Sequence, residues 1–463
     1  MNITELTIQT AAEAIVSQQL SPVELTQAYL ERIEAIDPKI TSFVYVMYDE
    51  AMAAAKEAEA EIAAGHYRGP LHGIPIGVKD LCDTAGVLTE AGSAILKGRI
   101  PTTDATLVKK LKEAGAILVG KTRTHEFAFG GFTPGTSNPW KLTHVPGGSS
   151  GGSGAAIAAD LCLAAIGTDT GGSIRIPAAV NGTVGFKPTF GRVSKAGVYP
   201  LSWSLDHPGP MTKTVEDAAL VLAAIAGWDS RDPNTVKQPL PDFSGMADGI
   251  KGMTIGVERR FFFDQIHPDI AQAVNQAIAV LADLGAVIKE VEIPSLDFVM
   301  AAEFGIVMPE ASTIHQKNLR QHADLLTEDV RLWLEVGEFF LSTHYLKAQK
   351  LRSVIRADIQ RAYQEHQLDV MALPTTRGPA SVQGSMMLEW EGYQESIVDA
   401  YVKPSAPFNL SGQPSLSVPC GFTSDGLPIG MQIVGRPFDE PSCAKVGVAY
   451  QSATDWHKQR PPL

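Results

Sequence analysis

Residues 147–153 read Gly-Gly-Ser-Ser-Gly-Gly-Ser, and residues 169–175 read Asp-Thr-Gly-Gly-Ser-Ile-Arg. Each segment presents a serine, Ser149 or Ser173, within a glycine-rich turn. Because glycine lacks a side chain, backbone N–H groups there can approach a reacting oxygen atom. A run of such amides that ends at a serine is what an oxyanion hole beside a nucleophile requires. The two segments therefore predict a serine nucleophile with amides that hold its oxyanion.

A lysine upstream lies at the end of a short apolar run. Residues 73–80 read Gly-Ile-Pro-Ile-Gly-Val-Lys-Asp, so Lys79 follows three apolar side chains spaced along the segment. Burial among apolar groups lowers the pKa of a lysine and makes its neutral amine available as a base. We therefore expect a serine nucleophile that is activated by a lysine.

These three segments resemble the amidase signature family, whose members hydrolyse amides with a triad of serine, cis-serine and lysine. The resemblance identifies Ser173 as the nucleophile, Ser149 as the bridging serine, with a cis peptide bond, and Lys79 as the base. The spacings are 70 residues from Lys79 to Ser149 and 24 residues from Ser149 to Ser173, as in the family pattern. The likeness is strongest over about residues 70–220 and weaker beyond.

Further residues receive supporting roles. The resemblance implies an oxyanion hole formed by the backbone amides of Thr170, Gly171, Gly172 and Ser173. Asp169 and Arg175 flank the nucleophile, and we favour an ion pair that braces the turn over an unrelated salt bridge. Ser150 either supports the lysine or caps the helix that follows. Phe129 either lines the acyl pocket, as its place in the family pattern implies, or packs in the core.

The implied reaction is hydrolysis of a non-peptide C–N amide bond through an acyl-enzyme on Ser173, with Ser149 and Lys79 as the proton relay. Carbamate, urea-type and ester substrates stay open. A rival within the family is the A-type subunit of glutamine-dependent tRNA amidotransferases, which holds glutamine with an aspartate and an arginine. Here the aspartate position reads about Val402 and the arginine region reads Leu332-Trp333-Leu334, so both charges are missing. We therefore favour a free-standing hydrolase of a less polar amide, and regard a catalytically silent scaffold as a weaker alternative.

Two other motif matches compete with this interpretation. Residues 115–122 fit the phosphate-loop pattern GxxxxGK[ST], but Ala-Ile-Leu-Val between the glycines predicts a buried strand. Residues 147–151 fit the GxSxG nucleophile elbow, which needs a downstream acid and then a histidine. No downstream histidine lies in a convincing loop after a strand, so a Ser–His–Asp triad stays a weaker alternative. The chain has no HExxH motif and no Cys/His cluster, and we expect neither a metal nor a cofactor.

Composition limits the partners. The net charge of −13 and the lack of a Lys/Arg run argue against binding to nucleic acid or an anionic membrane. We expect a small-molecule substrate, and a homodimer stays open. Four cysteines lie far apart without a CxxC motif, as is typical of reduced thiols in a cytoplasmic protein. The first residues lack the basic start and apolar run of a signal peptide.

Short apolar runs alternate with helical segments beyond residue 70, which is typical of an α/β sheet. We expect a single large α/β/α sandwich with a central twisted mixed β-sheet flanked by helices. Expected strands are 74–78, 117–119, 163–166, 254–257, 287–291, 370–373, 416–418 and 431–434. Expected helices are 21–36, 51–64, 107–114, 270–284, 343–366 and 442–453. Residues 1–69 are expected as N-terminal helices that pack on an amidase domain of residues 70–463, with the polar segment 229–249 as the alternative place for a boundary.

Overall fold

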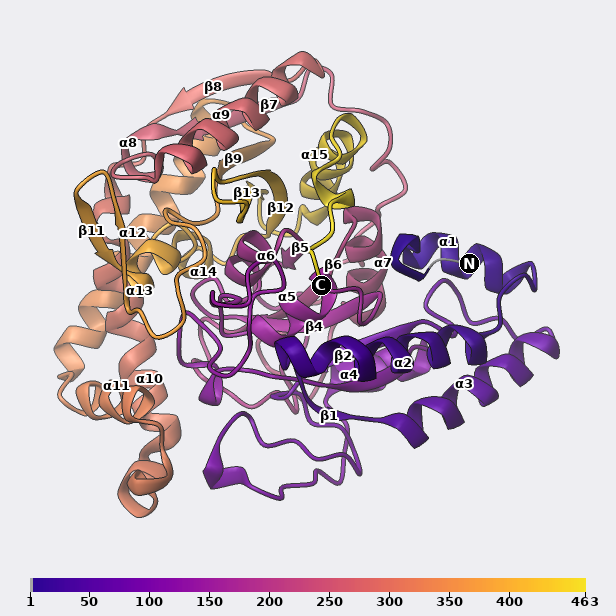
Figure 1. The fold of residues 1–463 in the computed structure, drawn as a ribbon. Coiled ribbons are helices and arrows are strands. Elements are labelled where there is room, and N and C mark those ends of the chain that lie inside the picture. The colour runs from indigo at the N-terminus through magenta and orange to yellow at the C-terminus, as the bar shows by residue number, and fades with distance from the viewer. Residues whose placement is uncertain (1–2) are drawn as a thin grey trace.

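A computed structural model describes residues 3–463 and confirms the α/β class, with one large mixed sheet flanked by helices (Figure 1). The hydrogen-bonded order of its eleven strands is β1 (Phe43–Val46), β3 (Ile117–Thr122), β2 (Pro75–Lys79), β4 (Ala164–Asp169), β6 (His207–Thr212), β5 (Val184–Lys187), β12 (Ser415–Phe422), β13 (Pro428–Val434), β9 (Val370–Pro374), β7 (Thr254–Glu258) and β8 (Val287–Val291). All eight strands expected from the apolar runs are present in this sheet.

The strand pairing brings two of the sequence motifs to one edge of the sheet. β2 pairs in parallel with both β3 and β4, and Val78 lies opposite Ile166 in the register of β2 with β4. Lys79 is the last residue of β2, and Asp169 is the last residue of β4. Ligands of open α/β sheets bind outside the carboxyl ends of the strands, which is where these two residues lie.

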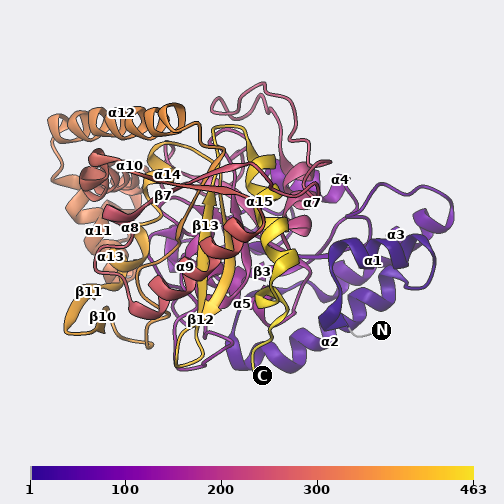
Figure 2. The same ribbon diagram turned by 90° about the horizontal axis from the view of Figure 1, so that it is seen from above.

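Helices cover both faces of the sheet (Figure 2). On one face, a buried apolar cluster combines alternate strand residues with side chains of four helices: α4 (Thr106–Glu113), α7 (Val215–Ile225), α9 (Pro268–Asp283) and α15 (Glu440–Ala453). On the other face, α5 (Gly151–Ala158) and α6 (Arg175–Asn181) contribute to a second cluster with the intervening strand residues. The alternation along a strand, with Ala164 and Ile166 in the first cluster and Ala165 in the second, follows from the two-residue period of β-structure.

The N-terminal segment combines three helices, α1 (Ile8–Val16), α2 (Pro22–Ile40) and α3 (Tyr48–Ala63), with the edge strand β1. The expected start of α2 is confirmed: the Ser21 hydroxyl accepts from backbone N–H groups, and the Glu24 side chain accepts from the Ser21 N–H. The helix continues past Pro38, beyond the end that we expected near residue 36. An expectation of helices alone missed β1, because four residues with only partial burial leave no clear alternating pattern.

A second group of helices packs beyond the sheet, at the left of Figure 1. It comprises α10 (Val299–Gln321), α11 (Glu328–Glu338) and α12 (Ser342–Glu365), which share a buried apolar cluster with the short helices α8 (Arg259–Phe262) and α14 (Pro407–Leu410). Helix α13 (Ile397–Val402) follows a small hairpin of β10 (Met387–Trp390) and β11 (Tyr393–Ser396). Side chains of α10, α11 and α13 line the cavity described below.

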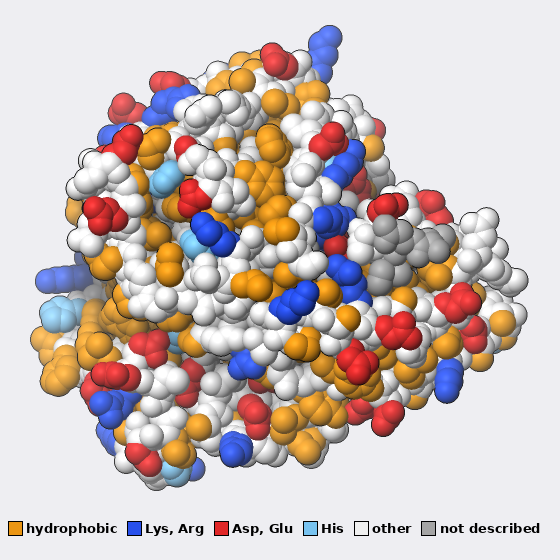
Figure 3. All heavy atoms as spheres, viewed as in Figure 1, with side chains coloured by type: hydrophobic (Ala, Val, Ile, Leu, Met, Phe, Trp, Pro, Cys, Tyr) orange, Lys and Arg blue, Asp and Glu red, His pale blue; other side chains and the backbone are white. Residues whose placement is uncertain are grey.

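The connection between α7 and β7 is irregular. No helix or strand lies between these two elements in the structure, so the polar segment 229–249 forms a long loop, and the domain organisation stays a prediction. Within residues 3–463, no helix has both the length and the apolar character needed to cross a membrane. On the face shown in Figure 3, acidic and basic side chains are interspersed rather than gathered into one basic field.

Candidate active site

Lys79 lies at the centre of a buried hydroxyl cluster. Its Nζ lies 2.8 Å from the Oγ of Ser149, 2.8 Å from the Oγ of Ser150 and 2.8 Å from the Oγ1 of Thr168. The side chain has no exposed surface. Burial lowers the pKa of Lys79 from 10.5 to about 7, and Cys82, Asp169 and Asp206 act in the opposite direction. The amine can therefore exchange its proton near neutral pH.

Ser149 lies in a loop that packs tightly against another backbone segment. The peptide bond between Gly148 and Ser149 is cis. The Ser149 carbonyl accepts a hydrogen bond from the His125 N–H at 3.1 Å and another from the Thr133 hydroxyl at 3.0 Å. A Cβ atom on Gly148 would lie 2.4 Å from the backbone carbon of Phe132. Glycine is required here because a neighbouring backbone occupies the side-chain space.

Ser150 occupies the N-cap position of α5, but its hydroxyl makes no capping bond. Instead its Oγ donates to the Thr168 carbonyl at 3.1 Å and accepts from the Thr168 N–H at 3.2 Å, in addition to its contact with Lys79. Its own N–H donates to the Ser173 carbonyl at 3.3 Å. Ser150 thus joins the lysine, the strand β4 and the turn that carries Ser173.

Ser173 lies in the turn between β4 and α6, and 7% of its surface is exposed. Over residues 3–463, the N–H groups of Thr170, Gly171 and Ser173 donate to no protein acceptor. The N–H of Gly172 differs, because it donates to Oδ1 of Asp169 at 2.8 Å. Three of the four expected oxyanion donors are therefore unoccupied, and the fourth holds the turn. No hydrogen bond joins the Ser173 hydroxyl to that of Ser149 in the described structure.

A buried ion pair fixes this turn. Arg175 binds Asp169 with two bonds of 3.0 Å, from Nε to Oδ2 and from Nη2 to Oδ1. Burial would raise the pKa of Asp169, but the charge and hydrogen bonds of Arg175 outweigh it and lower that pKa below its usual range. The guanidinium also donates to three oxygens of the C-terminal part of the chain, on Ser405, Asn409 and Gln432. Both residues of the expected pair are thus in contact.

A cavity of about 60 Å³ opens beside Ser173 and Gly171. Three aromatic residues line it: Phe129, Phe304 and Trp333. The ring centroid of Trp333 lies 6.3 Å from that of Phe129 and 6.0 Å from that of Phe304. Val402 lines the same cavity. Val402 is the position at which the A-type amidotransferase subunit was expected to carry its glutamine-binding aspartate, and residues 332–334 are the region of its arginine. Both regions therefore reach this cavity.

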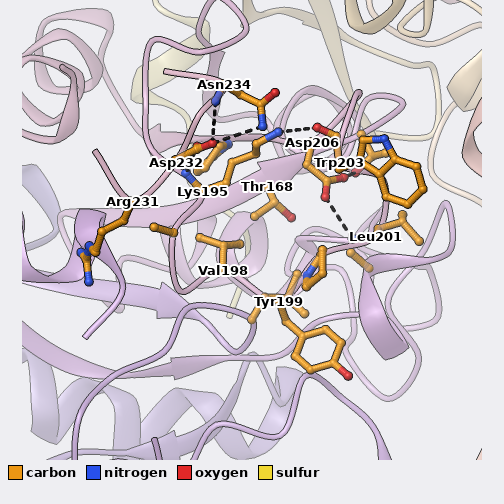
Figure 4. Close-up of a pocket in the computed structure, with 16 residues that line it drawn as sticks. Thr168, Lys195, Val198, Tyr199, Leu201, Trp203, Asp206, Arg231, Asp232 and Asn234 are labelled. Atoms are coloured by element: carbon orange, nitrogen blue, oxygen red, sulfur yellow. Dashed lines mark hydrogen bonds between the residues drawn. The ribbon is translucent and has the colours of Figure 1, made fainter. Parts of the chain in front are cut away.

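A second cavity of about 250 Å³ adjoins the first and is shown in Figure 4. The two cavities share Ala128, Thr170 and Leu201 as lining residues. The Thr170 hydroxyl donates to Oδ1 of Asp206 at 2.7 Å, and the Lys195 Nζ donates to the Trp203 carbonyl at 2.6 Å. The second cavity therefore has charged side chains, among them Lys195 and Asp206, next to the aromatic Tyr199 and Trp203.

Sequence reasoning missed several of these residues. Thr168 precedes the Asp169 motif by one position, and its place at the end of a strand beside Lys79 was the available signal. Glu303, on α10, lines the first cavity without any motif around it. Over the described residues, no histidine ring nitrogen is hydrogen-bonded to the hydroxyl of Ser149 or of Ser173, so the Ser–His–Asp alternative gains no geometric support. Nor do residues 3–463 contain a cluster of three or more His, Cys, Asp or Glu side chains that could hold a metal ion.

Comparisons with known proteins show the family to which this chain belongs. A family model described as Amidase matches residues 24–444. An amidase from Pseudomonas putida is 43% identical over 100% of this chain and 99% of its own. The A-type subunit of a glutamyl-tRNA(Gln) amidotransferase from Myxococcus xanthus is 41% identical over 100% of both chains. A solved structure of a vestigial protein complex, described as revealing the evolutionary origins of an s-triazine catabolic enzyme, is similar to this chain with a TM-score of 0.92 and 33% identity. The match covers 96% of this chain and 98% of that one.

The fold and the site define a hydrolase that acts on amide C–N bonds. The chain belongs to the amidase family, as the three glycine- and lysine-containing segments predicted.

Proposed function

We propose that this chain is a free-standing amidase that cleaves a small, non-peptide amide through an acyl-enzyme on Ser173. The observation that carries the proposal is the buried Lys79–Ser149 contact of 2.8 Å beside a serine whose turn presents unoccupied amide donors. Each part supplies one element of acyl transfer: a base, a relay hydroxyl, a nucleophile and an oxyanion site.

The hydrogen bonds around Lys79 support the direction of proton transfer. The Ser150 hydroxyl donates its proton to the Thr168 carbonyl, so toward Lys79 it can only accept. The lone pair of a neutral amine must then face Ser149 or Thr168. We assign the relay to Ser149, because its neighbour Ser150 donates its N–H to the Ser173 carbonyl and because the Ser–cis-Ser–Lys pattern of the family has a serine at this position. Neutral Lys79 takes the Ser149 proton while Ser149 takes that of Ser173.

The reaction then proceeds in two halves. The Ser173 Oγ bonds to the carbonyl carbon, and the carbonyl oxygen becomes an oxyanion that the free N–H groups of Thr170, Gly171 and Ser173 can bind. As the C–N bond breaks, the proton returns from Lys79 through Ser149 to the leaving nitrogen. A water molecule, deprotonated by the same relay, then attacks the acyl-enzyme and releases the acid. The cavity beside Ser173 holds the acyl group, with Phe129 and Trp333 against it.

The similarity to amidotransferase A-type subunits supports a second candidate, a glutaminase subunit that works with partner chains. Glutamine carries an ammonium and a carboxylate, and the carboxylate requires a cationic group in the pocket. Among the described lining residues of the cavity at Ser173 there is no lysine, arginine or histidine. We therefore expect glutamine to be a poorer substrate than simple amides. Carbamates, urea-type compounds and esters stay open as further substrates of the same acyl-enzyme chemistry.

The test combines active-site labelling with a substrate panel. A fluorophosphonate should modify the wild-type chain at Ser173, and the Ser173→Ala variant should not be labelled. The panel comprises aliphatic amides, anilides, carbamates, esters and glutamine, each followed by product release. Labelling without turnover of any member would contradict a free-standing amidase, and addition of amidotransferase partner subunits would then test the second candidate.

A further inference from the structure

Glu303 is a buried carboxyl group that no part of the mechanism uses. It lies on α10, with 2% of its surface exposed. Its Oε2 has no hydrogen-bond partner among the described residues, and no basic group lies within ion-pair distance of it. A buried carboxyl without a partner is costly, so its retention calls for a ligand that completes it.

The carboxyl lies beside the reacting centre. A methyl group built on Gly171 would lie 3.0 Å from Oε1 of Glu303 and 3.3 Å from a methyl carbon of Val402. Gly171 carries one of the unoccupied N–H groups two residues before Ser173. An acyl group that is bound to Ser173 with its oxygen on these amides therefore extends past Glu303 within a few bonds of the carbonyl carbon.

The remaining lining favours one charge type. Glu303 carries the only ionisable side chain among the described residues that line this cavity. Phe304 and Trp333 stack with an interplanar angle of 7°, and Phe129 completes an aromatic wall. A carboxyl group together with aromatic rings, without a competing cation, is a setting that attracts organic cations.

We propose that Glu303 binds a protonated amine on the acyl portion of the substrate, which makes amino-acyl amides the preferred substrate class. The inference rests on the proposed amidase function and specifies its substrate. On this inference glutamine should bind weakly despite its ammonium group, since its carboxylate would enter a cavity whose one ionisable group, among the described lining residues, is acidic.

The charge state of Glu303 supplies an independent readout. Burial raises the pKa of Glu303 well above its usual range, and Arg352 on α12 offsets only part of this. The other charged groups around it are Glu310 on α10 and the paired Asp169 and Arg175. In the empty site the carboxyl therefore keeps its proton to a higher pH than an exposed glutamate does, and a bound ammonium favours loss of that proton. Affinity for the amine should rise with pH until the free amine itself loses its proton.

The test uses pairs of amides that differ only in an ammonium or a methyl group. The pairs are glycinamide and propionamide, 3-aminopropionamide and butyramide, and 4-aminobutyramide and pentanamide. We expect kcat/KM to favour the amine in at least one pair. Glu303→Gln and Glu303→Leu should lower that amine-to-methyl ratio on the order of 10- to 100-fold, as for loss of a charged hydrogen bond. Fluorophosphonate labelling of Ser173 in both Glu303 variants serves as the control for an intact fold and relay.

Two controls separate the possible outcomes. Glu310→Gln removes a buried carboxylate from the same helix whose partners, Ser202, Ser204 and Tyr345, lie outside this cavity, and it should leave the ratio unchanged. Calorimetric binding of the same pairs to Ser173→Ala tests recognition without turnover. A ratio that changes less than about threefold in both Glu303 variants, for every chain length, overturns the inference while hydrolysis of the methyl amides upholds the amidase. Amine-selective binding without any hydrolysis by the wild type upholds the inference and rejects the amidase.

Discussion

Replacement of Lys79 by alanine tests the base and its environment together. In the wild type, a pKa of about 7 means that roughly a tenth of the molecules carry neutral Lys79 at pH 6 and roughly nine tenths at pH 8. Since only the neutral amine can accept the Ser149 proton, kcat/KM for an amide should rise about tenfold over this interval and level off above it. Without burial, the same limb would lie near pH 10.

The variant should lose both the rate and this pH limb. A positioned general base contributes roughly 10²- to 10⁴-fold, so Lys79→Ala should lower amide kcat/KM by about that factor at pH 8. The loss should be smaller for an activated aryl ester, because its leaving group needs no proton. The assay is ammonia release from butyramide and phenolate release from the ester, from pH 5.5 to 9.

Two results would refute this reasoning. Wild-type amide turnover by Lys79→Ala between pH 7 and 9 would exclude the lysine as base and reopen the histidine alternatives. A wild-type limb with its midpoint near pH 10 would leave the lysine in place but contradict the effect assigned to burial. Fluorophosphonate labelling of the variant, slowed but still at Ser173, serves as the control for an intact nucleophile site.

The same geometry makes four other outcomes testable. Ser173→Ala should keep the fold by circular dichroism and form no acyl adduct, and an adduct seen by mass spectrometry would show that another residue is the nucleophile. EDTA should leave activity unchanged, whereas loss of activity that a divalent ion restores would reveal a metal. Ammonia release from glutamine should have a kcat/KM well below that of the best simple amide, and equal values would contradict the cavity argument. Arg175→Met should lower the free energy of unfolding by about 3–5 kcal/mol because it leaves the Asp169 carboxylate buried without its partner; a denaturation midpoint equal to that of the wild type would rule out the brace.

Much of the central site could be predicted from the sequence because its residues lie in short motifs with fixed spacing. Lys79, Ser149 and Ser173 are named by three segments, and the strands β2 and β4 that carry two of those segments are apolar runs. The approach of Lys79 to Thr168, at the start of the segment that carries Ser173, then follows from the parallel pairing of β2 with β4. The pair Asp169–Arg175 was also within reach, since both residues flank the nucleophile.

Other features could not be predicted because they depend on packing between distant segments. Strand β6 contains Pro208 and Pro210, which argue against a strand in the sequence, yet it pairs with both β4 and β5. Glu303 is one of many acidic residues on helices, and only the tertiary structure shows that it lacks a partner. The bond from the Gly172 N–H to Asp169 could not be predicted either, because the sequence does not show whether a backbone amide binds a carboxylate or is free.

The Arg175 ion pair has a consequence for how the enzyme is made. All three triad candidates have been synthesised once the ribosome has passed residue 173, but the groups that hold Arg175 come from residues 405–432, close to the end of the chain. A nascent chain in which residues 405–432 have not yet left the ribosome lacks these three acceptors of the Arg175 guanidinium. An oxyanion turn with all of these contacts therefore requires residues 405–432 to fold against it, well after the segment that carries Ser173 has been synthesised.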